Sequence, residues 1–161
     1  MGILAGLISE NVDRHTQDIT TLTATASITT ADHSGRTLLM GEVGGDAAAT
    51  FTLPAATGTG SVFKFVVSVV NTSNYLIKVA DATDTIDGQI IITDADGTAA
   101  TSFVTAAASD TITLNGTTTG GGAIGDYVEL IDIASNQYSV SGMVTCAAGS
   151  NIATMFSASV S

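Results

Sequence analysis

Charged side chains are scarce in this chain of 161 residues, and positive ones are the scarcest. Lysine and arginine together number four and aspartate and glutamate fifteen, so 12% of the residues are charged and the net charge is −11. An average soluble domain is about 25% charged. Nucleic acids and anionic membranes are bound through clustered positive side chains. The four here are scattered at Arg14, Arg36, Lys64 and Lys78, so we expect neither kind of partner.

Cysteine and long apolar runs are also lacking. Cys146 is the only cysteine, which excludes an intrachain disulfide and a cysteine-based metal site, and a lone thiol is usually a small buried hydrophobe. No apolar run approaches the 18 or so residues of a membrane span. The short apolar stretch at 3–8 follows no basic segment, as a secretion signal requires. We therefore expect a protein that is made in the cytoplasm and not exported.

Side chains suited to catalysis are few. His15 and His33 are the only histidines, in a polar N-terminal stretch and in a turn-like segment. No serine has the context of a nucleophile elbow, so no Ser-His-Asp triad is predicted. The glycine-rich run 116–125 lacks the lysine and the following helix of a phosphate-binding loop, and we interpret it as a flexible hairpin loop. We expect no enzymatic activity and assign no catalytic residue and no cofactor.

Two groups of aspartates resemble parts of a calcium site. The sequence DADG at 94–97 looks like the start of an EF-hand loop, but Thr105 stands at the twelfth position, where a bidentate acid is needed. Asp81, Asp84 and Asp87 are spaced by three and could converge in one loop. Aspartates that cap the backbone of their own turns are far commoner, however. No metal site is assigned.

Alternating strand patterns are what the chain does contain. Leu22, Ala24, Ala26 and Ile28 alternate with threonine and serine, which is the period of a half-buried strand. The segment 62–70 is almost continuously apolar and predicts a central strand buried on both faces. Further strands are predicted at 50–53, 75–80, 86–93, 101–105, 110–115, 127–133 and 138–144. Frequent turns and the lack of helical periodicity after residue 18 predict an all-β fold, an antiparallel β-sandwich or jelly roll.

The first 18 residues differ from the rest. Ile3, Leu4, Leu7 and Ile8 have the spacing of one face of a short helix, and a polar stretch separates them from the strands. We therefore predict an N-terminal arm over 1–18 and a β-sandwich domain over 19–161. The four apolar side chains either pack on the chain's own core or bind a partner surface.

The predicted surface is neutral, because threonine, serine, alanine and glycine fill most of it. Such a surface repels neighbours weakly and is easily desolvated, so it suits a subunit that packs against copies of itself. Lys64 lies inside the most apolar strand. It either pairs with an acid across a subunit interface or extends its amine to solvent.

Four sequence segments, taken in this order, resemble segments of the head decoration (cement) proteins of tailed bacteriophages. They are LPAATGTGSVFKFVV (53–67), IKVA (77–80), DTITLNGTTTGG (110–121) and DYVELIDI (126–133). The resemblance spans roughly residues 27–145, the size of one small domain. It implies a homotrimer on the outer capsid surface of the virion, bound to the major capsid protein and stabilising the shell.

On this interpretation the arm would contact the capsid through Ile3, Leu4, Leu7 and Ile8. The resemblance carries no catalytic or metal-binding residue. The alternative is a tail-fibre or adhesin-type module that binds glycans on the host surface, since tail fibres share the strand–LPAA–strand element. Sugar-binding modules usually offer aromatic platforms, whereas this chain has no tryptophan and 5% aromatic residues, which favours the cement protein.

Overall fold

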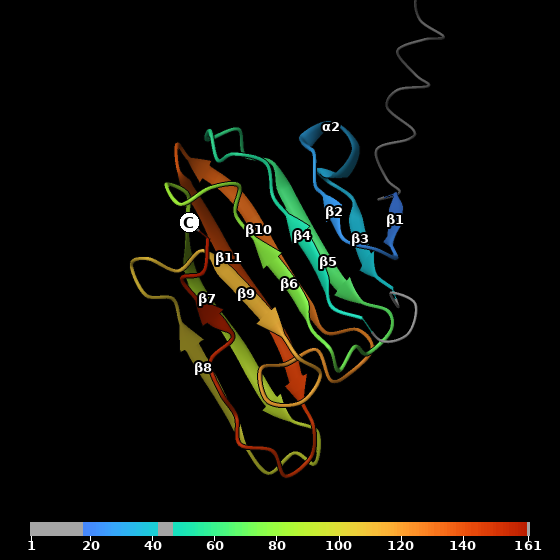
Figure 1. The fold of residues 1–161 in the computed structure, drawn as a ribbon. Helices are drawn as coiled ribbons and strands as arrows, with labels where there is room; N and C mark the ends of the chain where they lie inside the picture. The colour runs from blue at the N-terminus through green and yellow to red at the C-terminus, as the bar shows by residue number, and fades with distance from the viewer. Residues whose placement is uncertain (1–17, 42–46, 161) are drawn as a thin grey trace, which may run out of the picture.

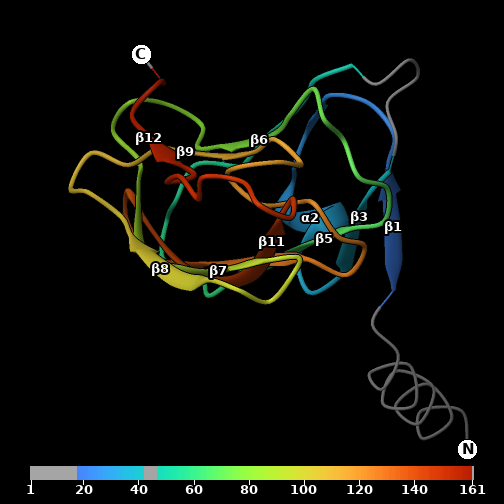
Figure 2. The same ribbon diagram turned by 90° about the horizontal axis from the view of Figure 1, so that it is seen from below.

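The computed structural model describes residues 18–41 and 47–160, and these form two β-sheets packed face to face (Figures 1 and 2). The helix found among the described residues, α2 (Thr30–His33), has a single turn. The all-β sandwich predicted from the strand patterns is confirmed. No helix in the described ranges has the length and apolar character to cross a membrane.

The larger sheet has seven strands and the smaller sheet five. In spatial order the larger sheet consists of β1 (Ile19–Leu22), β3 (Thr37–Met40), β5 (Val62–Val67), β10 (Tyr127–Ala134), β11 (Gln137–Cys146), β7 (Thr85–Asp94) and β8 (Ala100–Val104). The smaller sheet consists of β12 (Phe156–Ser157), β9 (Thr111–Leu114), β6 (Tyr75–Lys78), β4 (Ala49–Thr52) and β2 (Ala26–Ser27). β1 and β8 therefore form opposite edges of the larger sheet (Figure 1).

Both sheets mix parallel and antiparallel pairs. The strands from β1 to β7 alternate between the two sheets, so the chain crosses from one sheet to the other between each of these strands and the next. Each return to a sheet runs in the same direction, which makes β1, β3 and β5 parallel neighbours, and likewise β2, β4 and β6. A jelly roll has antiparallel strand pairs. The predicted sandwich is therefore found, but its described strands are not all paired antiparallel as in a jelly roll.

The core lies between the sheets and is built from every second residue of the strands. In β5, Phe63, Phe65 and Val67 are fully buried, and the residues between them are half-buried on the outer face. The ring of Phe51 on β4 stacks on Phe65 and on Tyr75 of β6, with ring centroids 5.8 and 6.0 Å apart. The Phe51–Phe65 contact joins the two sheets, and the Phe51–Tyr75 contact joins neighbouring strands of the smaller sheet.

Two strand predictions need correction. The alternating segment 22–28 is not one strand: β1 belongs to the larger sheet and β2 to the smaller, and the chain crosses between them at 23–25. The strand predicted at 62–70 is not buried on both faces, because its outer face is covered by no further layer of the described chain and it ends at Val67. The predicted domain boundary falls next to β1, while Ile3, Leu4, Leu7, Ile8 and His15 lie outside the described residues.

Candidate functional site

The carboxylate of Asp132, near the end of β10, organises the corner that joins the two sheets. It is 3% exposed. Its oxygens accept hydrogen bonds from the backbone N–H groups of Thr57 (3.0 Å), Gly58 (2.6 Å) and Thr59 (3.0 Å), and from the Thr59 hydroxyl (2.7 Å). Burial alone raises the pKa of this carboxyl, but the hydrogen bonds outweigh burial and hold it below its ordinary value. Asp132 is therefore held as an anion that fixes the loop between β4 and β5.

The same corner contains the LPAATGTG segment on which the resemblance to cement proteins partly rests. The buried Asp84 carboxylate accepts from the Ala56 N–H at 3.2 Å, and the Tyr138 hydroxyl donates to the Pro54 carbonyl at 2.8 Å. Burial, reinforced by the charges of Asp81 and Asp132, raises the pKa of Asp84. These contacts hold the segment in place where the chain passes from the smaller to the larger sheet.

Asp126 fixes the glycine-rich segment 116–125 to the larger sheet. Its buried carboxylate accepts from the Thr145 N–H (2.8 Å) and hydroxyl (2.9 Å) and from the Ala123 N–H (3.3 Å). Burial outweighs these bonds and raises its pKa. The hairpin predicted here is wrong, because β9 and β10 belong to different sheets and the segment crosses between them. The Asn115 side-chain oxygen also accepts from three backbone N–H groups of the segment, at 2.8–3.0 Å.

The aspartates considered for calcium do not converge. Asp81 accepts from the Thr83 N–H and hydroxyl in its own turn, whereas Asp84 faces Ala56 and Asp87 accepts from the Gln137 amide at 2.8 Å. In the DADG turn, Asp94 accepts from the next-but-one N–H, and Asp96 accepts from Thr98. In the part of the chain that the structure describes, no three His, Cys, Asp or Glu side chains are placed to hold a metal ion.

Chelation should therefore leave the fold unchanged. We expect the same melting temperature with and without EDTA, because each of these carboxylates already accepts hydrogen bonds within the protein. Thermal unfolding followed by circular dichroism measures this. A drop of several degrees in EDTA, reversed by added calcium, would show that these aspartates hold an ion.

The structure also places three further residues singled out in the sequence, namely His33, Cys146 and Lys64. His33 ends α2, and its Nδ1 accepts from the Thr29 N–H at 3.1 Å. Cys146 is fully buried in β11, as expected of a lone thiol, and burial raises its pKa. Lys64 lies on the outer face of β5 with its amine 5.0 Å from the centre of the Tyr127 ring.

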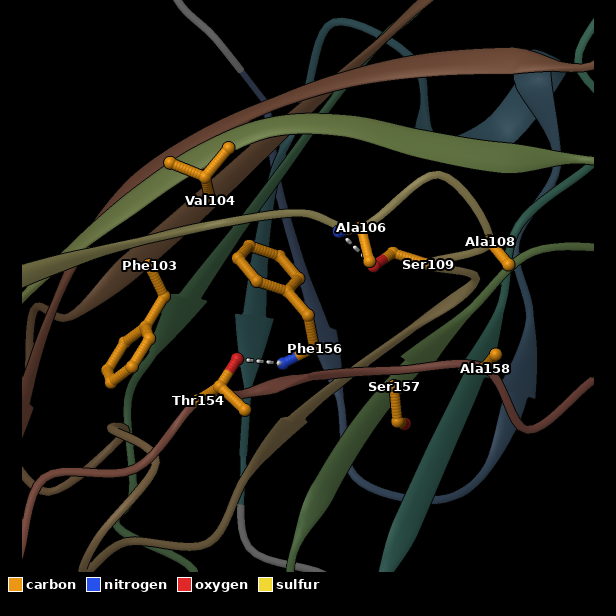
Figure 3. A pocket seen from close by; sticks show the side chains of 9 residues that line it. All are labelled: Phe103, Val104, Ala106, Ala108, Ser109, Thr154, Phe156, Ser157 and Ala158. Carbon is orange, nitrogen blue, oxygen red and sulfur yellow. Dashed lines mark hydrogen bonds between the residues drawn. The ribbon is translucent and has the colours of Figure 1, made fainter.

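A groove of about 450 Å³ lies between the edge strands β8 and β12 (Figure 3). It is lined by Phe103, Val104, Ala106, Ala108, Ser109, Thr154, Phe156, Ser157 and Ala158. The lining contains no ionisable side chain, and the Ser109 and Thr154 hydroxyls accept from nearby backbone N–H groups. The groove offers apolar surface, without a group positioned for acid, base or nucleophilic chemistry.

Sequence reasoning missed this groove and the outer face of the larger sheet. The groove joins residues about 50 positions apart through the pairing of β12 with β9, which no local pattern reveals. The outer face had a visible signal: Ile91 and Met143 occupy the outward positions of alternating strands. No protein-family model matches the chain, and no curated protein matches it.

Proposed function

We propose that this protein is a structural virion protein, a decoration protein that binds the outer surface of a tailed-phage capsid as a homotrimer and stabilises the shell. The observation that carries the proposal is the use of the buried carboxylates. Asp132, Asp126 and Asp110 each accept hydrogen bonds from backbone N–H groups of corners, crossovers or the C-terminal segment. They brace a compact, charge-poor β frame, which suits a subunit that must resist deformation of a shell. The resemblance of 53–67 and 126–133 to cement proteins is the reason for proposing a phage capsid as that shell.

The proposed partner is the major capsid protein, contacted through Ile3, Leu4, Leu7 and Ile8. Fully burying such a side chain is worth about 1.5–3 kcal/mol, from which the free energy of ordering the arm must be subtracted. Three arms in one trimer add their contributions when all of them engage at once. Attachment by several short apolar arms would therefore be strong even if each arm alone bound weakly.

The alternative function, a glycan-binding fibre or adhesin module, has less support. Stacking on a sugar needs an exposed aromatic ring, and Tyr75 and Tyr138 are fully buried. Of the two rings that are partly exposed, Tyr127 lies under the Lys64 amine on the outer face and Phe103 lines the groove between β8 and β12. Copy number separates the two functions: hundreds of copies per virion are expected of a cement protein, and a few to a few tens of a fibre.

Deleting residues 2–16 should leave a folded, soluble oligomer that no longer decorates capsids. We expect binding to undecorated shells to weaken at least about 100-fold, because the apolar contacts of the arm are lost. Co-sedimentation with shells measures attachment, and circular dichroism checks the fold. Replacing Ile3, Leu4, Leu7 and Ile8 together with serine should have the same effect.

A matched control replaces the polar arm residues Glu10, Asn11 and Asp13 with serine and should bind as the wild type does. If the truncated protein binds as tightly as the full chain, attachment lies on the β domain and the assignment of the arm is wrong. If the truncated protein fails to fold, the four apolar residues belong to the protein's own core.

A further inference from the structure

An apolar row crosses the outer face of the larger sheet. Strand register places Leu39 beside Val66, Val66 beside Tyr127, Tyr127 beside Met143, and Met143 beside Ile91. Their neighbours along each strand are buried in the core, so these five side chains point away from it. With strands about 4.8 Å apart, the row is about 19 Å long.

This row is open to solvent in the described part of the chain. Met143 is 51% exposed and Ile91 44%, while Leu39, Val66 and Tyr127 are half-buried. The solvated face of a sandwich sheet is usually polar. A contiguous apolar strip on such a face marks an interaction surface, and tyrosine and methionine are enriched at protein interfaces.

The next row of outward positions contains a self-complementary charge pair. Lys64 and Glu129 lie side by side on β5 and β10, and the other outward side chains of both rows are uncharged. The described residues contain no ion pair between the two, since the Lys64 amine lies over the Tyr127 ring. This surface is therefore neutral, although the whole chain has a net charge of −11. Two copies would repel each other less here than over the rest of their surface.

We infer that copies of this chain bind one another through this outer face, with the apolar row buried and Lys64 of one copy against Glu129 of the partner subunit. The symmetry axis runs parallel to the strands, in front of the gap between β5 and β10. Such an axis sets the β3–β5 half of one face against the β10–β11 half of the next. Val66 then packs on Tyr127 of the partner subunit and Leu39 on Met143 of the partner subunit. This inference rests on the self-association in the proposed function and names its surface.

A twofold axis in that position makes this pairing along the whole row, because the two outer faces then lie parallel to each other. A threefold axis would incline neighbouring faces steeply, so these seven-stranded sheets would meet at their outer strands and Val66 and Tyr127 would lie too far apart to touch. This surface therefore predicts a pair of copies, whereas the homotrimer of the proposed function needs a different contact, and the measured mass tests which of the two is present.

The experiment compares the mass of variants by light scattering over about 1–100 µM protein, the range in which weak and moderate self-association is resolved. Met143→Asp places an unpaired charge in the apolar row and should weaken association at least about 100-fold. Lys64→Glu sets like charges against each other and should also dissociate the oligomer, whereas the double variant K64E/E129K restores opposite charges and should restore it.

Matched controls carry the same changes on the outer face of the smaller sheet. Leu76→Asp and Lys78→Glu replace half-buried, outward residues of β6 and should leave the mass unchanged. Circular dichroism melting of each variant confirms that it is folded. Because both members of the charge pair are on the surface, the double variant tests the contact even if Met143→Asp is unstable.

Each outcome bears on a different statement. Restored association in the double variant supports the inference. If the wild type is oligomeric and no variant changes its mass, this surface is not the contact, although self-association itself is supported. If the wild type is a dimer, the surface stands but the proposed trimer is wrong. A monomeric wild type over the whole range overturns both, while shell binding is still tested by co-sedimentation. Variants that stay oligomeric but lose shell binding would assign this face to the capsid and overturn the inference.

Discussion

Replacing Gly88 with alanine is expected to lower the free energy of unfolding by about 4 kcal/mol and the melting temperature by about 10 °C. Gly88 lies in β7 opposite Val140 of β11, with φ at +144°. An added Cβ would stand 2.1 Å from the Val140 carbonyl oxygen. A side chain at this φ is strained by itself, and the close approach forces β7 and β11 apart at the middle of their ladder.

Gly97→Ala is the matched control for this change. Gly97 also has a positive φ, of +74°, but nothing lies within 4 Å of its added Cβ. Only the backbone strain remains, which is worth about 1–2 kcal/mol. Urea unfolding of both variants measures the difference. Equal losses of stability at the two sites would mean that the β7–β11 contact adjusts to a side chain, contrary to the expected clash.

Asp132→Asn should lower the free energy of unfolding by about 3 kcal/mol at pH 7, because hydrogen bonds to a charged acceptor are worth about 1.5–3 kcal/mol each. Asparagine has one oxygen where the carboxylate has two. Its amide group would face the N–H of Thr57 and Gly58 or that of Thr59, all of which donate to Asp132. Buried donors in this corner would lose their acceptor, and the β4–β5 loop would loosen.

The loss should depend on pH in a defined direction. The pKa of Asp132 is lower in the folded protein than its ordinary value, which is about 3.9 in an unfolded chain. Its stabilisation is therefore complete above that value and disappears as pH falls through the lower, folded pKa. The stability difference between wild type and Asp132→Asn, measured by urea unfolding, should shrink below about pH 4. A difference that is the same at pH 3 and pH 7 would contradict the role of the charge.

Asp84→Asn is the control with the opposite sign. Burial raises the pKa of Asp84 in the folded state, so its ionisation destabilises the fold as pH rises from the ordinary value through the folded one. An asparagine oxygen can still accept from the Ala56 N–H, the contact that Asp84 makes at 3.2 Å. We expect this variant to be about as stable as the wild type at pH 7, in contrast to Asp132→Asn.

Local patterns were sufficient to place most strands but not to pair them. Alternation located the strands that became β4, β6, β7, β10 and β11, because burying one face of a strand leaves a period of two in its residues. The same alternation continued through 23–25, where the chain crosses between sheets, since threonine and alanine are tolerated in both settings. β12 was missed because its two residues are too few to show a period. β3 was missed because its sequence, TLLM, does not alternate between apolar and polar residues.

Lys64 was a sequence signal against burial of 62–70 on both faces. A lysine rarely lies fully inside a core, and in the structure it marks the outer face of β5. The parallel pairing follows from repeated crossing between the sheets, which depends on loop geometry more than on strand composition.

The candidate sites were predictable only in part. That the aspartates of 81–96 serve turns could be expected from their spacing, and the structure places Asp81 and Asp96 in such turns. Asp132 binds a loop about 75 positions away in the sequence, and the apolar row unites five strands, so both depend on tertiary register. The contact of Ile3, Leu4, Leu7 and Ile8 with a capsid stays a prediction.

The position of β11 determines when the larger sheet can be completed. Although β11 is the last long strand to be synthesised, it lies inside the larger sheet and joins β10 to β7. Until it is complete, β7 and β8 have no bonded connection to β1, β3, β5 and β10 within that sheet. The larger sheet can therefore be completed only when nearly the whole chain is available, and such distant pairings form slowly. The delay also has a use, since Ile91 becomes adjacent to Met143 only when β11 docks. A subunit that lacks β11 cannot present the complete apolar row, so only chains that are complete through this strand would enter an assembly.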